Sequence, residues 1–552
     1  MLLERVEIAG FRGINRMSLV LEQNNVLIGE NAWGKSSLLD ALTLLLAPDP
    51  ALYQFVRNDF WFPPGDLQSR EHHLHIVLTF RERDPGQRRA ESHRALASCR
   101  VQGNDGFQRI FYRLEGELAQ DGSVVTQRSF LNAAGQSLSI ADADAQARHL
   151  VRLMPVLRLR DARFMQRIRN GAVPDVPDIE LTARQLDFLS RQLVNSPQNL
   201  TDAQIRQGLS TMVQLLEHYF TEQSSAASRQ RLMRRRSHDE RRSWRYLDII
   251  NRMIERPGSR SHRMILLGLF STLLQAKGSV RLDKEARPLL LIEDPETRLH
   301  PIMLSVAWNL LNLLPLQRIA TTNSGELLAM TPVEHVCRLV RDADRVVPWR
   351  LGPDGLSAED ARRIAFHIRF NRPSSLFARC WLLVEGETET WVINELARQC
   401  GHHFDAEGVK VIEFAQSGLK PLIKFARRMG IEWHVLVDGD EAGKKYAATV
   451  RGLVNGDTEL ERLHLTALPA LDMEHFMYRQ GFADVYHRVA QIPQDVHMNI
   501  RRTIIKAIHR SSKPDLAIEV AMEAGRRGVD AVPPLLRKMF SRVLWLARGR
   551  GD

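Results

Sequence analysis

Residues 25–37 hold the motif that most restricts the fold of this chain: a short apolar segment, a glycine-bounded loop and an apolar helical pattern. The loop and the start of the helix read Gly29-Glu-Asn31-Ala-Trp-Gly34-Lys35-Ser36-Ser37, which fits the spacing GxxxxGK[ST]. Glycines let backbone N–H groups wrap a phosphate, and the following helix directs its N-terminus at it. The lysine reaches the β/γ-phosphates and the first serine ligates Mg²⁺. The sequence therefore predicts a P-loop for a nucleoside triphosphate.

A second acidic segment fits the same site. Residues 289–292 are four apolar residues, and Glu293-Asp294-Pro-Glu follows them. An apolar strand that ends in two acids is the Walker B arrangement, in which Glu293 holds Mg²⁺, through water, and Asp294 orients or deprotonates the attacking water. No NKxD motif for guanine is found, so ATP is the expected nucleotide.

Two further segments favour the ABC-type branch of P-loop ATPases. Residues 257–263, which include Ser259, precede an apolar helix roughly thirty residues before the acidic strand, where such ATPases keep their signature segment. That segment contacts the γ-phosphate bound by a second protomer, which predicts a homodimer. Asn323 follows the next expected strand, at the place of the usual switch histidine.

A separate group of carboxylates lies far downstream. Glu385 follows the apolar residues 381–384, and Glu389 comes four residues later; Asp438 and Asp440 follow another apolar segment at 434–437. Acids at the carboxyl ends of parallel strands converge on one crevice of an open α/β sheet. Oxygen ligands of this kind suit Mg²⁺ or Mn²⁺, and such ions can activate water against a phosphodiester. Glu474 is a candidate additional ligand.

Strands and helices alternate in both halves of the chain, which predicts an α/β fold with two sheets. We expect a turn at residues 11–13, a short strand at 19–21 and hairpin turns near residues 103–106 and 121–122. The stretch from residue 141 to about 256 is instead polar, arginine-rich and helical in pattern. Residues 350–375 are polar and suggest a linker.

Composition limits the partners. The net charge of +11 fits a polyanion such as DNA. No apolar run approaches the ~18 residues of a membrane span, and no signal peptide is seen, so a cytoplasmic protein without membrane contact is expected. A run of arginines that includes Arg158 is consistent with a polyanion-binding segment and equally with a solvated helix face or a mobile loop. The four cysteines lie far apart and form no CxxC pair: Cys99, Cys337, Cys380 and Cys400.

Together these motifs, with Phe11-Arg12-Gly13 before the P-loop, resemble the OLD-family ATP-dependent endonucleases, in which an ABC-type ATPase related to RecF and SMC proteins is fused to a TOPRIM domain. The resemblance implies an ATPase in two parts (1–160 and 256–372), a helical dimerisation insertion (161–255) and a TOPRIM nuclease (376–552). It implies metal-dependent DNA nicking or cleavage, with Glu385 as base or ligand and Lys513 as the transition-state cation. The implied site residues fall into two sets: for nucleotide Arg12, Gly29, Asn31, Gly34, Lys35, Ser36, Ser37, Ser259, Glu293 and Asn323, and for metal Ser36, Glu385, Glu389, Asp438, Asp440 and Glu474.

Two departures from the family pattern predict slow ATP turnover. Asparagine at 323 cannot become cationic, and Asp294 is shorter than the usual glutamate. Two other functions stay open: an ATP-dependent DNA clamp with a silent TOPRIM domain, and a topoisomerase or primase. This chain lacks the paired zinc-ribbon cysteines of a primase. A topoisomerase needs a tyrosine nucleophile, for which Tyr446, Tyr478 and Tyr486 are the candidates.

Overall fold

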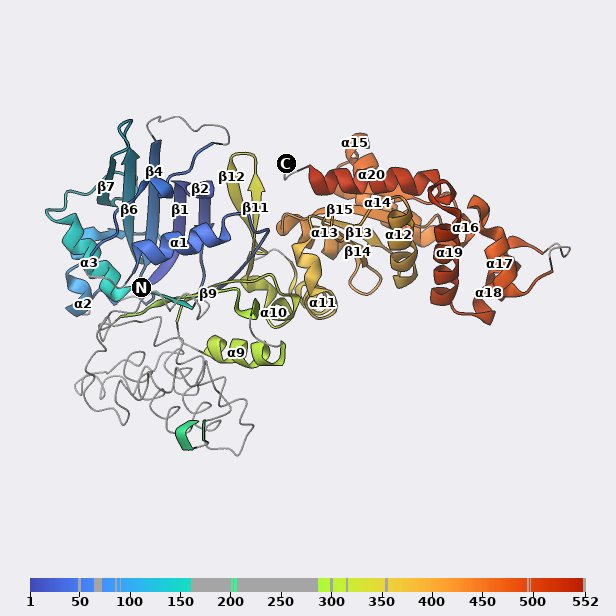
Figure 1. Ribbon diagram of the computed structural model, residues 1–552, viewed down its shortest axis with the longest axis horizontal. Helices are drawn as coiled ribbons and strands as arrows, with labels where there is room; N and C mark the ends of the chain where they lie inside the picture. Colours follow the sequence, from blue (N-terminus) through green and yellow to red (C-terminus); the bar gives the residue numbers. More distant parts are fainter. Residues whose placement is uncertain are drawn as a thin grey trace. The chain divides into compact units, whose positions relative to one another are not determined.

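The computed structural model describes residues 1–47, 51–63, 72–84, 87–89, 91–159, 200–201, 203–205, 286–297, 301–313, 316–352, 356–493, 496 and 498–549. The chain divides into two compact units (Figure 1). The first comprises Met1–Thr331, His335–Val340 and Asp344–Pro348, and the second Pro332–Glu334, Arg341–Ala343 and Trp349–Asp552. In the described part of the chain, no helix is both long enough and apolar enough to cross a membrane.

A mixed sheet forms the framework of the first unit. Its described strands run in the order β5-β6-β4-β1-β2-β12-β11-β3-β10-β9-β8, with β7 beside β6. The strands are β1 (Leu2–Phe11), β2 (Ile14–Val20), β3 (Asn24–Ile28), β4 (His72–Arg81), β5 (Arg100–Gln102), β6 (Gln108–Leu118), β7 (Val124–Leu131), β8 (Val156–Leu159), β9 (Leu289–Glu293), β10 (Arg318–Thr321), β11 (Val336–Asp342) and β12 (Arg345–Trp349).

The sheet has an antiparallel part and a parallel part. Pairs β1–β2, β1–β4, β4–β6, β5–β6 and β6–β7 are antiparallel. Pairs β3–β10, β3–β11, β9–β10 and β8–β9 are parallel. The carboxyl ends of β3, β10 and β9 therefore share one edge, which is where the P-loop and both acids were expected.

Local sequence accounts for these elements. Apolar residues alternate along β1 and bury one face, and the expected turn at residues 11–13 joins it to β2, with Arg12 at φ 45°. β2 starts five residues earlier than the strand expected at 19–21, because pairing with β1 extends it. The hairpin turns expected near residues 103–106 and 121–122 do connect β5, β6 and β7.

Helices of the first unit include α1 (Lys35–Leu45), α2 (Glu91–Arg94), α3 (Ala143–Leu153), α9 (Pro301–Leu313) and α10 (Gly325–Ala329). The apolar face of α1 buries Leu38, Leu39, Leu42 and Leu45 in the same core as the β1 and β4 side chains. This packing fixes the start of α1, and with it the P-loop, against the sheet.

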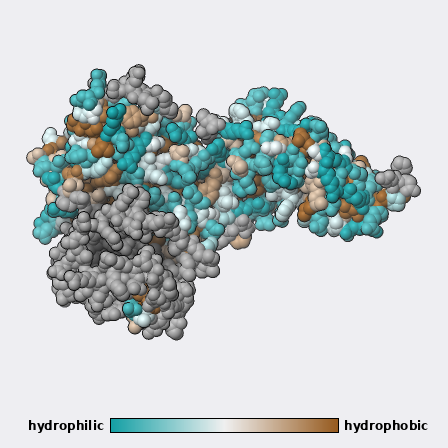
Figure 2. Space-filling model, in the orientation of Figure 1, coloured by the Kyte–Doolittle hydropathy of each residue, from teal (hydrophilic) through white to brown (hydrophobic). Residues whose placement is uncertain are grey.

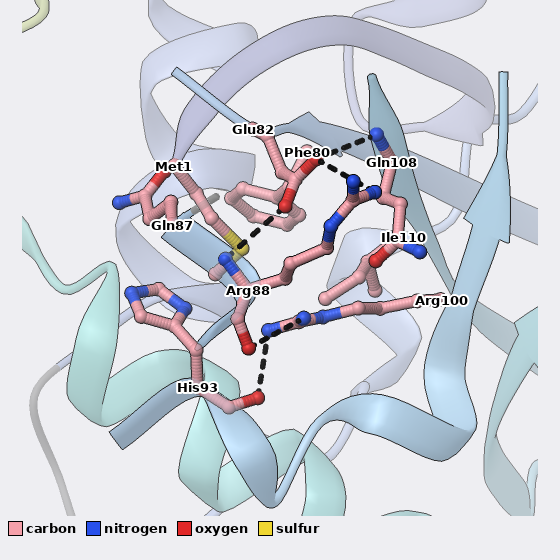
Figure 3. Close-up of a pocket in the computed structure, with 9 residues that line it drawn as sticks. All are labelled: Met1, Phe80, Glu82, Gln87, Arg88, His93, Arg100, Gln108 and Ile110. Atoms are coloured by element: carbon pink, nitrogen blue, oxygen red, sulfur yellow. Dashed lines mark hydrogen bonds and ion pairs between the residues drawn. The ribbon is translucent and has the colours of Figure 1, made fainter. Parts of the chain in front are cut away.

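A small cavity of about 10 Å³ lies beside Met1, between β4, β6 and α2 (Figure 3). This is about the space of one water molecule. Glu82 accepts hydrogen bonds there from the backbone of Arg88 and Gln108. Burial, followed by nearby arginines, lowers the pKa of the Met1 amino group to about 5. The cavity is a polar packing gap and is too small for a ligand.

The second unit is built on a four-stranded parallel sheet of order β14-β13-β15-β16. Its strands are β13 (Cys380–Val384), β14 (Val409–Glu413), β15 (Glu432–Val437) and β16 (Leu465–Ala467). Its helices are α11 (Ala358–Ile364), α12 (Glu387–Gln399), α13 (Leu419–Arg428), α14 (Glu441–Leu453), α15 (Thr458–His464), α16 (Met473–Met477), α17 (Ala483–Ala490), α18 (Ile500–Arg510), α19 (Lys513–Arg527) and α20 (Pro534–Arg548).

The strands of this sheet are nearly continuous apolar runs, because helices cover both faces of a parallel sheet. Trp381 is fully buried and stacks on Phe425 of α13, with ring centroids 5.9 Å apart. The segment expected to be a linker is instead helical: α11 is followed by a π-helical turn (Ala365–Asn371) and a 3₁₀ turn (Pro373–Phe377). Polar composition there reflects exposed helix faces.

Candidate functional site

The P-loop has the backbone that its sequence requires. Gly29 has φ 148°, and a Cβ at this position would lie 2.6 Å from the Leu339 carbonyl oxygen. Gly34 has φ 89° and caps the start of α1. Both values lie where only glycine is unstrained. The loop between β3 and α1 therefore keeps its backbone N–H groups at the edge of the sheet.

Lys35 is buried and folded back onto the loop. Its Nζ donates to the Gly29 carbonyl and to Asn323 Oδ1, the latter at 2.9 Å. Burial lowers the pKa of Lys35, and Asp294, Glu296 and Glu30 partly offset this effect. The structure thus brings the P-loop lysine together with the residue at the switch position.

The acids after β9 lie at the same edge. Register places Glu293 beside Thr321 at the end of β10. Asp294 has φ 39°, a left-handed conformation that aspartate tolerates better than most residues. Its Oδ1 accepts from Thr321 Oγ1 at 2.9 Å, and Glu296 Oε1 accepts from the Asn323 amide at 2.7 Å. These bonds fix Asp294 and Asn323 opposite the P-loop.

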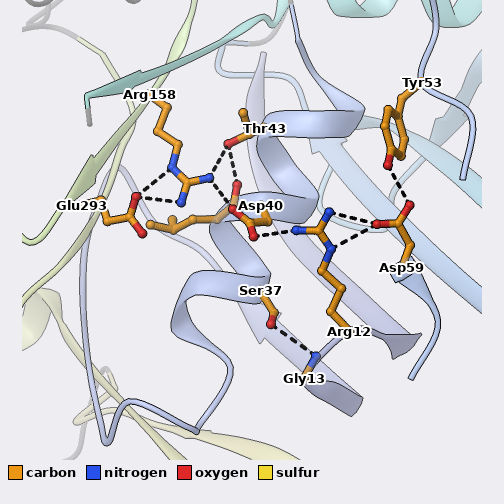
Figure 4. Close-up of polar contacts among 10 residues, drawn as sticks. Arg12, Gly13, Ser37, Asp40, Thr43, Tyr53, Asp59, Arg158 and Glu293 are labelled. Carbon is orange, nitrogen blue, oxygen red and sulfur yellow. Dashed lines mark hydrogen bonds and ion pairs between the residues drawn. The ribbon is translucent and has the colours of Figure 1, made fainter. Parts of the chain in front are cut away.

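A row of alternating charges runs beside the P-loop helix and includes Asp40 on that helix (Figure 4). Arg12 donates to Asp59 at 2.9 Å and to Asp40 at 2.6 Å, and the second oxygen of Asp40 accepts from Arg158 at 2.6 Å. Arg158 also donates to Glu293 at 2.7 Å. Arg12, expected at the nucleotide, is thus held by Asp59 and by Asp40, which lies one helical turn after Ser36 in α1.

Sequence reasoning missed Arg158 and Asp40 as parts of this site. Arg158 lies on buried β8 with a side chain 5% exposed, so its interpretation as a solvated face was wrong. Asp40 lies four residues after Ser36 on the same face of α1, which was a usable signal. Ser37 Oγ accepts from the Gly13 amide at 3.3 Å, whereas the side chains of Ser36 and Asn31 form no hydrogen bond or ion pair with the described residues. Ser259 lies outside the described residues, as does the helical insertion apart from residues 200–201 and 203–205.

The second unit gathers its acids at the carboxyl edge of its sheet. Glu385 directly follows β13, and Glu389 lies in the first turn of α12, where its Oε2 accepts from the Gly386 amide at 2.9 Å. Asp438 follows β15, and Asp440 caps α14 through the Gly443 amide at 2.7 Å. The four predicted carboxylates therefore come together at neighbouring strand ends.

The pKa values of these carboxyl groups indicate that they share one electrostatic environment. Burial raises the pKa of Asp438 to about 8, and the charges of Glu389, Glu385, Asp472 and Glu474 add to this effect. Burial likewise raises the pKa values of Glu385 and Glu389, with contributions from neighbouring carboxylates. Carboxylates that raise one another's pKa values in a partly buried crevice need a cation to ionise together.

Two residues named from sequence, Glu474 and Lys513, also join the group. Glu474 lies in α16, is 6% exposed, and has Oε1 3.1 Å from Lys513 Nζ at the start of α19. Burial would lower the pKa of Lys513, but Glu474, Asp472 and Glu389 raise it overall. Asp472, which caps α16, was missed; the signal was its place just after the fourth parallel strand.

Two glycines set the close approach of the acid-bearing segments. A Cβ on Gly439, between the two aspartates, would lie 2.3 Å from the Ala470 carbonyl oxygen. A Cβ on Gly443 would lie 1.9 Å from the Asp438 carbonyl oxygen. Both distances are far below any allowed contact, so the Asp438–Asp440 turn depends on these glycines.

The donor set fits a divalent cation. Glu385 Oε2 is buried and has no hydrogen-bond partner within the described part of the chain, and neither Glu474 oxygen accepts a well-aligned hydrogen bond. Such oxygen donors suit Mg²⁺ or Mn²⁺. Elsewhere in the described ranges, and here, no three His, Cys, Asp or Glu side chains already stand at ligating distances. Side-chain rotation would therefore accompany cation binding.

Comparison with known proteins matches both parts of the chain to protein families. Residues 1–375 match the family described as "Protein of unknown function (DUF2813)", and residues 376–440 match the "Overcoming lysogenization defect protein-like, TOPRIM domain". The chain belongs to the DUF2813 family and carries an OLD-like TOPRIM domain. This DUF2813 protein is 79% identical over 552 residues, the whole of both chains, to "Uncharacterized protein YbjD" of Escherichia coli K12. The expected resemblance to the OLD family is confirmed.

More distant relatives match parts of this DUF2813 protein. The "Old nuclease" of Escherichia phage P2 is 27% identical over 230 residues, 40% of this chain and 38% of that protein. The C-terminal region of the Burkholderia pseudomallei OLD protein aligns at TM-score 0.27 and 19% identity, over 31% of this chain and 99% of that one. The SMC head domain from Thermotoga maritima aligns at TM-score 0.28 and 12% identity, over 64% and 100%. The expected α/β fold class is confirmed by the two sheets, and the expected TOPRIM domain by its family match.

Proposed function

We propose that this protein is an ATP-regulated, divalent-metal-dependent DNA endonuclease. The observation that carries the proposal is the group of coupled carboxylates at one edge of the TOPRIM sheet, with Lys513 beside them. Four other acids act on Asp438 electrostatically: Glu389, Glu385, Asp472 and Glu474. Their mutual repulsion costs stability, which is typical of a site that binds cations and a polyanionic substrate.

Each residue at this edge has a role in phosphodiester hydrolysis. Glu389, Asp438, Asp440 and Glu474 would hold Mg²⁺ or Mn²⁺, which, when bound, polarises the phosphodiester and lowers the pKa of water. Glu385 accepts the proton of the attacking water or joins the ligands, because its raised pKa makes it a stronger base than an exposed carboxylate. Lys513 neutralises the phosphate once its ammonium leaves Glu474.

The first unit supplies control by ATP. Backbone N–H groups of residues 29–34 hold the phosphates, Lys35 and Ser36 complete the site, and Asp294 orients water. Lys35 must exchange its bond to Asn323 for one to a phosphate when nucleotide binds. Asn323 remains uncharged at every physiological pH, so it contributes less to a developing γ-phosphate charge than a protonated histidine would. We therefore expect slow ATP turnover and a homodimer closed by ATP, with Ser259 of each protomer at the other's phosphate.

Plasmid nicking tests the proposal. Supercoiled DNA is incubated with the full chain and Mg²⁺ or Mn²⁺, with and without ATP, for wild type, Glu385→Gln, Asp438→Asn and Lys35→Ala. We expect wild type to nick, both carboxylate variants to lose at least about a hundredfold in rate, and Lys35→Ala to lose only the effect of ATP. The matched control is Glu441→Gln, whose carboxylate lies beside Asp440 but is 84% exposed, and it should nick normally.

Other outcomes favour the alternative functions. Absence of nicking by wild type with either metal, with and without ATP, would refute the endonuclease and favour an ATP-dependent clamp. Covalent protein–DNA adducts would favour a topoisomerase. Tyr486 is a poor nucleophile for that reaction, because it is 2% exposed and burial raises its pKa.

A further inference from the structure

A groove runs along the outer side of α12 and α19 in the second unit. Its volume is about 920 Å³. α12 lines it with Trp391 among polar side chains that include Glu395 and Arg398, and α19 with mainly apolar residues and Arg526. Three large apolar side chains stay exposed there: Trp391 at 55%, Met522 at 47% and Ile518 at 40%. Burying these side chains under a ligand would be favourable.

One end of the groove lies near the N-terminus of α12, whose first turn carries Glu389. Glu389 lies one residue before Thr390 in α12, and Lys513, the first residue of α19, lies within electrostatic reach of Glu389. At the other end, a Cβ on Gly525 would lie 3.1 Å from the Gln399 side-chain nitrogen. The helices are therefore parallel, and both direct their N-termini at the carboxylates. The part of α12 that lines the groove, residues 390–399, spans about 15 Å, the length of about four nucleotides of one strand.

The groove also carries cationic groups suited to phosphates. Arg398 is paired with Glu395 at 2.7 Å and Arg526 with Glu523 at 3.2 Å. Both guanidinium groups are about 60% exposed, and exposed pairs of this kind contribute little free energy. A phosphate can therefore replace the carboxylate partner at small cost.

We propose that this groove binds a single-stranded segment of the nucleic acid next to the scissile phosphodiester, with a base stacked on Trp391 and phosphates against Arg398 and Arg526. The proposal rests on the proposed endonuclease function, since the groove leads away from its carboxylates. A single strand fits better than a duplex, because only an unstacked base presents its face to an aromatic side chain. Exposed tryptophan with interleaved arginine is the usual composition of such a surface.

Binding without cleavage tests the groove by itself. A dye-labelled single-stranded oligonucleotide is titrated with the full chain in EDTA, and anisotropy gives the affinity. We expect Trp391→Ala to weaken binding about tenfold and Trp391→Phe to retain most of it, because one stacked base is lost only in the first. The matched control is Trp545→Ala: Trp545 is 61% exposed on α20 and does not line the groove.

Salt dependence separates stacking from phosphate contacts. Arg398→Ala and Arg526→Ala should each reduce the slope of log affinity against log salt by roughly 0.7, whereas Trp391→Ala should leave it unchanged. Arg462→Ala, which removes a 72% exposed arginine paired three residues away with Glu459, is the control. Met522→Glu is a second probe that keeps Trp391 and adds a negative charge to the groove.

The results distinguish the two proposals. Unchanged affinity in both Trp391→Ala and Met522→Glu would refute nucleic-acid binding in the groove. A loss of affinity in Trp545→Ala equal to that in Trp391→Ala would also refute it. Neither result would decide whether the protein nicks plasmid. Loss of affinity in the Trp391 and Met522 variants, in a protein whose wild type nicks no plasmid, would uphold the groove as a nucleic-acid site and refute the endonuclease.

Discussion

The guanidinium of Arg158 lies between Asp40 and Glu293, with Nη1 2.6 Å from Asp40 Oδ1 and Nη2 2.7 Å from Glu293 Oε2. One buried cation thus joins the P-loop helix to the strand that carries the expected Mg²⁺ ligand. Arg12 repeats the arrangement on the other oxygen of Asp40. Arg158 therefore links α1 to β9, and Arg12 links α1 to the turn that carries Asp59.

Removing Arg158 should destabilise the first unit. In Arg158→Met, two carboxylates that are 23% and 24% exposed lose their shared cation. We expect the free energy of unfolding to fall by about 2–3 kcal/mol, less than for a fully buried pair. Urea denaturation measures the change. Arg5→Met, which breaks an exposed pair at 3.9 Å, should change stability by less than about 0.5 kcal/mol; equal effects would contradict the role of Arg158.

Stability without metal should depend on pH through Asp438. Folding raises the pKa of Asp438 to about 8, chiefly by burial, whereas an unfolded aspartate titrates near pH 4. Between these values the folded chain binds the extra proton, so its free energy of unfolding falls as pH rises. We expect a loss of about 1–3 kcal/mol between pH 5 and pH 8 in EDTA. Asp438→Asn should flatten this dependence, and a steep profile in that variant would assign the effect to other groups.

Divalent cations should reverse this loss. Mg²⁺ or Mn²⁺ at a hundredfold excess over its dissociation constant stabilises the folded state by about 2.7 kcal/mol. A thermal melt of wild type at pH 8 should show the increase in midpoint, and EDTA should abolish it. Glu385→Gln and Asp438→Asn should respond weakly, whereas Glu441→Gln should respond like wild type. If neither cation changes the midpoint of thermal unfolding of the wild type, the result would argue against a metal centre.

Gly439→Ala should disrupt the candidate metal site more than a glycine substitution nearby. A methyl group at 439 would overlap the Ala470 carbonyl, which is backbone and cannot move away cheaply. We expect a loss of stability of about 2 kcal/mol or more and no midpoint increase with Mn²⁺. Gly452→Ala, in the same helix-bearing segment but facing open space, should instead stabilise by about 0.5–1 kcal/mol. Equal behaviour of the two variants would contradict the packing argument.

Much of the candidate site could be read from the sequence, because its residues are local to strand ends. A P-loop needs its glycines, lysine and serine in one short segment, and the apolar strand before it is equally local. The same holds for Glu385, Glu389, Asp438 and Asp440: each follows an apolar run, and parallel strands necessarily bring their carboxyl ends to one edge. Strand bounds were less accurate, as in β2, since pairing with β1 extends it beyond its own pattern.

Other features depend on partners distant in sequence. Arg158 is 118 residues from Asp40 and 135 from Glu293, and in isolation a basic residue in an arginine-rich stretch favours a solvated face. The bond from Lys35 to Asn323 and the approach of Glu474 to Lys513 likewise join separate elements. So does the groove, whose two helices lie more than a hundred residues apart.

The sequence alone therefore determined which chemical groups this protein has for phosphate and metal, because backbone conformation and strand order are encoded within short segments. Tertiary structure decided the electrostatic state of those groups. Burial raises the pKa of Asp438 and so decides whether its carboxyl group keeps a proton. Only the pairing of β8 with β9 in the sheet brings Arg158 to Glu293. Desolvation and charge pairing are properties of the folded environment, and no local pattern of residues contains them.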